Sequence, residues 1–111
     1  MKFCTNNVST STFTITSNST TLTSVIPAGY KLLDVVVYNR EVFGVTATLS
    51  TTVGGGEILF EESLGVGGWV DSDVGRVLSF TSPSSLYFTC PETLTASGVI
   101  IVITSRFSLA S

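Results

Sequence analysis

The sequence contains no histidine and few charged residues of either sign. Histidine is the side chain best suited to proton transfer near neutral pH, so its absence excludes the usual catalytic triads and zinc sites. The five lysines and arginines are scattered and the net charge is −3, which leaves no basic stripe to neutralise a row of phosphates. We therefore expect no enzymatic activity, no cofactor, no metal ion and no nucleic-acid binding.

Cysteine and long apolar runs are also scarce. Cys4 and Cys90 are the two cysteines; they permit one disulfide but do not indicate a disulfide scaffold. We expect both thiols to be free, with Cys90 packed as a small apolar residue. The longest apolar run, Val99 to Ile103, is far shorter than the roughly 20 residues of a membrane helix, and the N-terminus turns polar too soon for an export signal. We expect a soluble chain with no membrane segment.

Two pairs of acidic residues are the remaining candidates for chemistry. Glu61 and Glu62 are adjacent, and adjacent residues of a strand face opposite sides, so they cannot act together as glycosidase carboxylates do. Asp71 and Asp73 would point the same way in extended backbone and could supply half of a calcium site. Calcium requires six to eight oxygen ligands, so a solvated acidic loop is the better interpretation.

Serine, threonine and apolar residues are abundant instead. The apolar fraction is 43%, the charged fraction is 12%, and serine and threonine together make up nearly a third of the chain. Threonine and valine suit a pleated sheet, and 111 residues are enough for one domain with a modest core. So little charge beside so many apolar residues indicates that some apolar surface contacts another chain.

Apolar residues that alternate with a period of two predict about eight strands and no helix. The predicted strands cover approximately residues 12–16, 20–26, 31–39, 45–50, 57–62, 77–81, 86–90 and 99–109. The segment 65–73 contains glycines and acidic residues and is predicted to be a loop. Short strands with regularly spaced turn signals are typical of a sandwich. We predict a single all-β domain over residues 12–111, an antiparallel β-sandwich of jelly-roll type, after a polar N-terminal arm over residues 1–11.

Two of the predicted strands are apolar on both faces, namely those at 31–39 and 99–109. Such a strand is buried on both faces, either inside the fold or against a neighbouring chain. The candidates for subunit contact are Leu32, Val36, Tyr38, Ile100 and Val102. The alternative, that these residues belong to the internal core, stays open.

The predicted loop holds a second candidate site. Trp69, Asp71 and Asp73 would form a shallow site at one end of the sandwich for a carbohydrate or receptor, since aromatic faces stack on sugars. A single tryptophan in a small sandwich is more often part of the core or of an interface, and this interpretation of Trp69 is favoured.

Several segments resemble, in the same order, parts of the small β-domains of tailed-phage virion proteins. They are the turn Ile26-Pro27-Ala28-Gly29-Tyr30, the apolar strand ending at Asn39, the glycine-rich hairpin after Thr51-Thr52, the run Leu86-Tyr87-Phe88 and the closing apolar strand. Related domains are found in head fibres, capsid decoration proteins and tail-fibre tips. The resemblance spans roughly residues 20–107 and rests on patterns of strands and turns.

The resemblance implies a β-sandwich or jelly roll that forms a homotrimer, and it carries no catalytic residues. It implies a virion structural protein, assembled in the host cytoplasm, whose partners are copies of itself and capsid or tail proteins. Fibre proteins usually have a long stem, whereas only about a dozen residues precede the strands here, which favours a compact decoration, cement or head-fibre protein. The alternative is a carbohydrate- or receptor-binding module that contacts a host-surface glycan.

Overall fold

The computed structural model describes residues 8–52, 58–79 and 82–107, and for residues 73–79 it describes the backbone only. The eight strands are β1 (Val8–Ile15), β2 (Ser19–Ile26), β3 (Tyr30–Asn39), β4 (Val45–Ser50), β5 (Leu59–Leu64), β6 (Trp69–Ser79), β7 (Ser84–Thr89) and β8 (Val99–Phe107). The described residues contain no helix, so the predicted all-β class and number of strands are confirmed. β1 begins at Val8, inside the predicted arm, and residues 1–7 of that arm lie outside the described residues.

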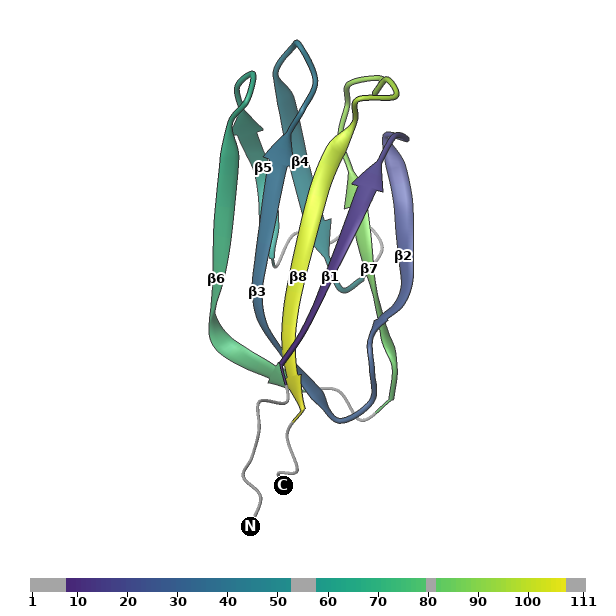
Figure 1. The fold of residues 1–111 in the computed structure, drawn as a ribbon, viewed down its shortest axis with the longest axis vertical. Helices are drawn as coiled ribbons and strands as arrows, with labels where there is room; N and C mark the ends of the chain where they lie inside the picture. Colours follow the sequence, from purple (N-terminus) through teal and green to yellow (C-terminus); the bar gives the residue numbers. More distant parts are fainter. Residues whose placement is uncertain (1–7, 53–57, 80–81, 108–111) are drawn as a thin grey trace.

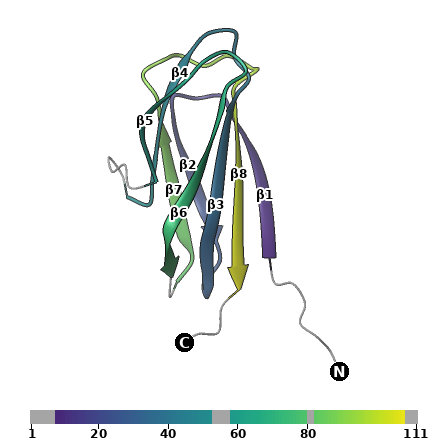
Figure 2. The ribbon, with the colours of Figure 1, turned by 90° about the vertical axis from the view of Figure 1, so that its left-hand side faces the viewer.

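The strands form two four-stranded antiparallel sheets that pack face to face (Figures 1 and 2). One sheet has the order β1-β8-β3-β6 and the other the order β2-β7-β4-β5. Every connection except the β4–β5 hairpin crosses from one sheet to the other. This interleaved order is that of a jelly-roll-like sandwich, and it agrees with the predicted fold class.

The core lies between the inner faces of the two sheets. On β4, the side chains of Val45, Ala47 and Leu49 are buried while Thr46 and Thr48 alternate with them on the outer face. Phe88 on β7 is the largest fully buried side chain. Each large apolar side chain buried in this way contributes about 1.5–3 kcal/mol to the free energy of unfolding, so the alternation itself specifies which face of each strand turns inward.

The connections between strands gather at the two ends of the sandwich. One end, called here the loop end and at the top of Figure 1, carries the connections 16–18, 40–44, 65–68 and 90–98. The first and last described residues lie at the opposite end, because β1 and β8 are antiparallel with Val8 opposite Arg106. Among the described residues, the loop end is therefore built from internal connections of the chain.

The predicted loop at residues 65–73 is wrong beyond residue 68, since β6 is an 11-residue strand from Trp69 to Ser79. It pairs with β3 in two runs, from Trp69 opposite Tyr38 to Asp73 opposite Asp34 and again at Leu78 and Ser79, with an irregularity in the register between them. Its glycine and acidic residues indicated a loop, but the main chain of β3 supplies its hydrogen-bond partners. Acidic side chains are compatible with β6 because it is an edge strand, where charge discourages pairing with further chains.

Candidate interaction surface

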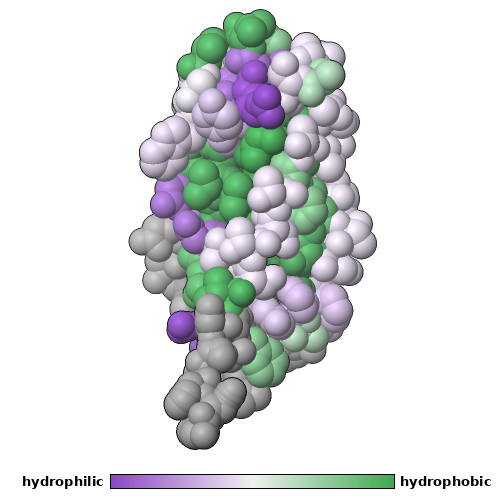
Figure 3. Space-filling model, in the orientation of Figure 1, coloured by the Kyte–Doolittle hydropathy of each residue, from purple (hydrophilic) through white to green (hydrophobic). Residues whose placement is uncertain are grey.

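The outer face of the β1-β8-β3-β6 sheet carries a cluster of apolar side chains at its centre. This apolar face consists of Val36, Tyr38, Trp69, Ile100 and Val102. In the register of the sheet, Val36 lies opposite Val102, and Tyr38 lies between Ile100 and Trp69. The side chains of Val36, Ile100 and Val102 are half-buried, Tyr38 is 39% exposed and Trp69 is 63% exposed. Figure 3 shows green, apolar surface over β3 and β8.

The placement of Leu32 on this outer face is wrong. The register of β3 shifts between Leu32 and Asp34 against both of its neighbours, which is the signature of a β-bulge. The extra residue changes the alternation, so that Leu32 shares the inner face with Val35 and Val37, and all three are fully buried. Leu32 is therefore a core residue and cannot contact another subunit.

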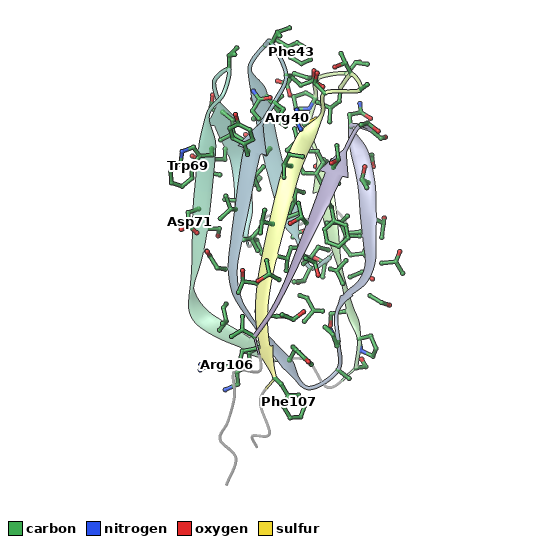
Figure 4. The ribbon with its side chains drawn as sticks, in the orientation of Figure 1. Arg40, Phe43, Trp69, Asp71, Arg106 and Phe107 are labelled. Carbon is green, nitrogen blue, oxygen red and sulfur yellow. The ribbon has the colours of Figure 1, made fainter. Side chains whose placement is uncertain are left out.

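The residues of the predicted ligand loop lie on the β6 edge strand instead. Trp69 and Asp71 are exposed, and both project from this edge in Figure 4. Asp71 lies opposite Val36 and therefore borders the apolar face. Asp73 lies opposite Asp34 in the register, but its side chain lies outside the described part of the structure. Trp69 belongs to the surface and not to the core.

The loop end carries further exposed apolar residues that the sequence analysis missed. Val42 in the β3–β4 connection is 84% exposed and Val66 in the β5–β6 connection is 65% exposed. Phe43 follows Val42 in the chain and lies at the top of Figure 4, with Arg40 just below it. Val66 stands between Gly65 and Gly67 in the sequence, and this position in a turn could have marked it, whereas Val42, between Glu41 and Phe43, carries no such signal. Val42, Phe43 and Val66, called here the apolar tip, form a second exposed apolar surface at the end of the sheet where Tyr38 and Trp69 lie.

The buried side chain of Asn39 fixes the two connections that carry the apolar tip. Its Nδ2 donates hydrogen bonds to the carbonyls of Phe43 at 2.8 Å and Gly65 at 3.0 Å, and a longer one to that of Leu64 at 3.3 Å. Its Oδ1 accepts from the Glu41 amide at 2.9 Å. A buried amide that uses both its donors and its acceptor is rigid, so Val42 and Val66 stand at defined positions.

Glu41 ties the third connection into the same network. Its carboxylate is 2% exposed and accepts hydrogen bonds from the Thr95 amide and hydroxyl, each at 2.5 Å, and from the Gly98 amide at 3.1 Å. Burial by itself would raise the pKa of this carboxyl, but the hydrogen bonds from Thr95 and Gly98 outweigh it, and the pKa of Glu41 lies below its ordinary value. The buried carboxylate is thus stabilised in its charged form.

We expect acid to destabilise the protein through Glu41. Because its pKa is lower in the folded state, its contribution to stability is complete above the ordinary value of 4.5 and is lost as the pH falls towards the folded value. Glu41→Gln removes the charge, and we expect it to lower the melting temperature by several degrees at neutral pH and by progressively less in acid. Thermal unfolding of both proteins across this pH range measures the difference.

Glu62→Gln is the matched control for this experiment, because Glu62 is an exposed carboxylate on β5. It removes the same charge outside the network, so its melting curve should follow that of the wild type at each pH. A Glu41→Gln protein with the pH profile of the wild type would contradict the role assigned to the carboxylate.

Cys90 is a free, buried thiol that follows β7. Its Sγ donates to the Glu92 carbonyl at 3.4 Å. Burial raises the pKa of the Cys90 thiol, and the neighbouring Glu92 carboxylate raises it further. A thiol with a raised pKa is a poor nucleophile, so Cys90 serves as a packing residue. Cys4 lies outside the described residues.

Across residues 8–52, 58–79 and 82–107, no three acidic or cysteine side chains gather in a way that could hold a metal ion. The same residues include no helix long and apolar enough to cross a membrane. The fold and its surface thus define a jelly-roll-like sandwich with an exposed apolar face on one sheet.

Comparison with known proteins gives one informative result. No protein-family model matches the chain, and no curated protein matches its sequence. The fold is similar to that of a chain in the capsid asymmetric unit of cyanophage Pam1, with a TM-score of 0.54. The two sequences are 14% identical, and the alignment covers 91% of this chain and 82% of the other. At this level of identity the similarity establishes a shared fold.

Proposed function

We propose that this chain is a non-enzymatic structural protein of a phage virion, which acts by associating with copies of itself and docking on the particle. The observation that carries the proposal is the apolar face. Val36, Ile100 and Val102 lie at the centre of a sheet and are only half-buried by their own chain. A contiguous apolar surface of this kind marks a contact with another molecule, and the similarity in fold to a phage capsid chain is consistent with that contact forming in a virion.

The expected assembly is a homotrimer, as in the phage domains that the sequence resembles. In a cyclic trimer, each copy would bury its apolar face against its neighbours around the three-fold axis. Buried apolar area stabilises such a contact by about 25 cal/mol per Å². Docking on capsid or tail proteins would then use the N-terminal arm or the edges of the sheets, where main-chain groups can pair with a partner strand.

Light scattering coupled to size-exclusion chromatography tests self-association directly. At micromolar concentration we expect a mass of about three chains of 11.7 kDa. A monomer at that concentration would contradict the proposal that the apolar face joins copies of this chain. Cryo-electron microscopy of the native particle would locate the protein on the capsid or tail, and its absence from the particle would contradict the virion role.

A second candidate function is a carbohydrate- or receptor-binding module. The observation that favours it is the indole of Trp69, which is 63% exposed on the β6 edge and next to the exposed Asp71. An exposed aromatic ring beside a carboxylate offers a stacking surface and a hydrogen-bond acceptor to a sugar. Loss of glycan binding in Trp69→Ala would support this second candidate, and a glycan array with no signal would contradict it.

A further inference from the structure

The two outer faces of the sandwich differ in chemistry. The apolar face lies at the centre of the β1-β8-β3-β6 sheet, whereas the outer face over β4 and β7 presents the hydroxyls of Thr46, Thr48 and Thr89. A hollow of about 410 Å³ lies on this second face, lined by Thr46, Thr48, Glu61, Thr89, Cys90 and Pro91. Ligand pockets occupy about 300–1,000 Å³, so the hollow has the size of a small-molecule site.

The hollow forms because β7 separates from β4. The two strands pair only as far as Thr48 opposite Thr89. Beyond that point the Cys90 amide donates to the Asn18 carbonyl at 3.0 Å. The Thr46 amide donates to a carboxylate oxygen of Glu92 at 3.0 Å. The amides of Thr46 and Cys90 therefore both have hydrogen-bond partners, and these hydrogen bonds stabilise the separation of the two strands.

The backbone of Glu61 is held in a costly conformation at this hollow. Its φ is +48°, in the left-handed region that residues other than glycine rarely adopt. The register of β5 shifts here against β4, between the pairs at Ala47 and Leu49, and the Glu61 amide donates to the Thr48 hydroxyl at 3.0 Å. Bulges of this type redirect a side chain, and strained residues of this kind cluster at binding sites.

We propose that this hollow binds one or two rings of a neutral or amino sugar. Sugar hydroxyls donate and accept hydrogen bonds, and the hydroxyls of Thr46, Thr48 and Thr89 can do both. The Glu61 carboxylate accepts from two donors at once and makes the stronger, charge-assisted bonds. The ring of Pro91 offers an apolar wall for the C–H face of a sugar ring. Acidic sugars are excluded, because Glu61 and Glu92 would repel their charge.

Sugar binding at the hollow would be a form of the second candidate function, carbohydrate binding, but on the opposite sheet from Trp69. It does not depend on self-association. An assembled trimer that binds no sugar would contradict the sugar site alone. A monomer that binds sugar at the hollow would contradict the apolar-face proposal alone. The two proposals therefore fail through different measurements.

The test is a glycan array with neutral, amino and acidic sugars, followed by titration calorimetry of the sugars that bind. We expect neutral or amino sugars to bind, and Glu61→Gln to weaken that binding about tenfold or more, as expected for the loss of charge-assisted hydrogen bonds. Glu62→Gln, the neighbouring exposed carboxylate outside the hollow, should bind within about twofold of the wild type. Thr89→Val, which removes one hydroxyl and keeps the side-chain shape, should weaken binding about fivefold.

Glu61→Gly separates binding from folding. Glycine adopts a positive φ without steric cost, so this variant should melt a few degrees higher than the wild type and bind no sugar. Chemical-shift mapping with the sugar that binds best should place the perturbations on β4 and β7. Three results would overturn the proposal: no binding of any neutral or amino sugar up to about 10 mM, unchanged binding by Glu61→Gln, or perturbations centred on Trp69 and Asp71.

Discussion

Replacing Gly98 with alanine is expected to lower the free energy of unfolding by about 2–4 kcal/mol. Gly98 has a φ of +68°, and an alanine Cβ there would lie 2.3 Å from the carbonyl oxygen of Ile15. The residue cannot move aside easily, because its amide donates to Glu41 and its carbonyl accepts from the Arg40 amide at 3.1 Å. The clash would therefore disturb the contacts that join β1, the β3–β4 connection and β8 at the loop end.

Gly67→Ala is the matched control for this prediction. Gly67 also has a positive φ, +72°, but an alanine Cβ there would have no atom within 4 Å. Only the backbone strain remains, so the expected loss is about 1–2 kcal/mol. Urea unfolding of the two variants and the wild type measures the difference. Equal losses for Gly98→Ala and Gly67→Ala would show that crowding at Ile15 does not matter.

Placing a positive charge at the centre of the apolar face is expected to separate the subunits. Val102 lies between Val36 on β3 and Thr12 on β1, and it is half-buried within its own chain. In Val102→Lys, an ammonium group would have to lose its water in the interface without a partner. We expect the dissociation constant of the assembly to rise about a hundredfold or more, as measured by sedimentation equilibrium over a range of concentrations.

Thr21→Lys provides the control for Val102→Lys, because it adds the same charge on the other sheet. Thr21 is exposed on β2 and lies opposite Tyr87. This variant should keep the mass of the wild-type assembly, and circular dichroism should report the same sheet content for all three proteins. If Val102→Lys kept that mass too, the subunits would have to meet through some other surface.

The hydrogen-bond network of Asn39 and Glu41 at the loop end makes the apolar tip rigid. Asn39 and Glu41 are buried polar residues, and together they join three connections that would otherwise move independently. Fully satisfied buried polar groups add rigidity, and a rigid surface loses less conformational entropy when it binds. The apolar tip is therefore better suited to a lasting contact than a flexible loop would be.

Much of the fold could be predicted from local patterns. Alternation along β4 predicts Val45, Ala47 and Leu49 inward and Thr46 and Thr48 outward, as the structure has them, because the period of a strand depends only on its backbone. Ser50, which the same alternation places outward, is buried. Strand lengths were less accurate. β5 runs from Leu59 to Leu64. Its bulge leaves Phe60 68% exposed, although a regular two-residue alternation would place Phe60 on the same face as the buried Ile58.

The candidate sites were predicted less completely than the fold. Val36, Tyr38, Ile100 and Val102 lie on the outer face, as the two-faced strands indicated, whereas Leu32 lies in the core. The hollow at Glu61 has no sequence signature, since threonine is common on strands and a positive φ at glutamate is not encoded by its neighbours. The buried role of Glu41 was also missed, because its partners Thr95 and Gly98 are more than 50 positions away.

The sequence by itself determined that the protein is all-β, that it has about eight strands, and that its apolar residues exceed what one small core can hide. These properties follow from composition and from a two-residue period, which are local. Only the tertiary structure decided that Leu32 of β3 faces the core and that β6 is a strand. It also decided how the loop-end network and the hollow are assembled. Each of these depends on hydrogen bonds between segments distant in sequence, and the free energy of that pairing overrides local preference.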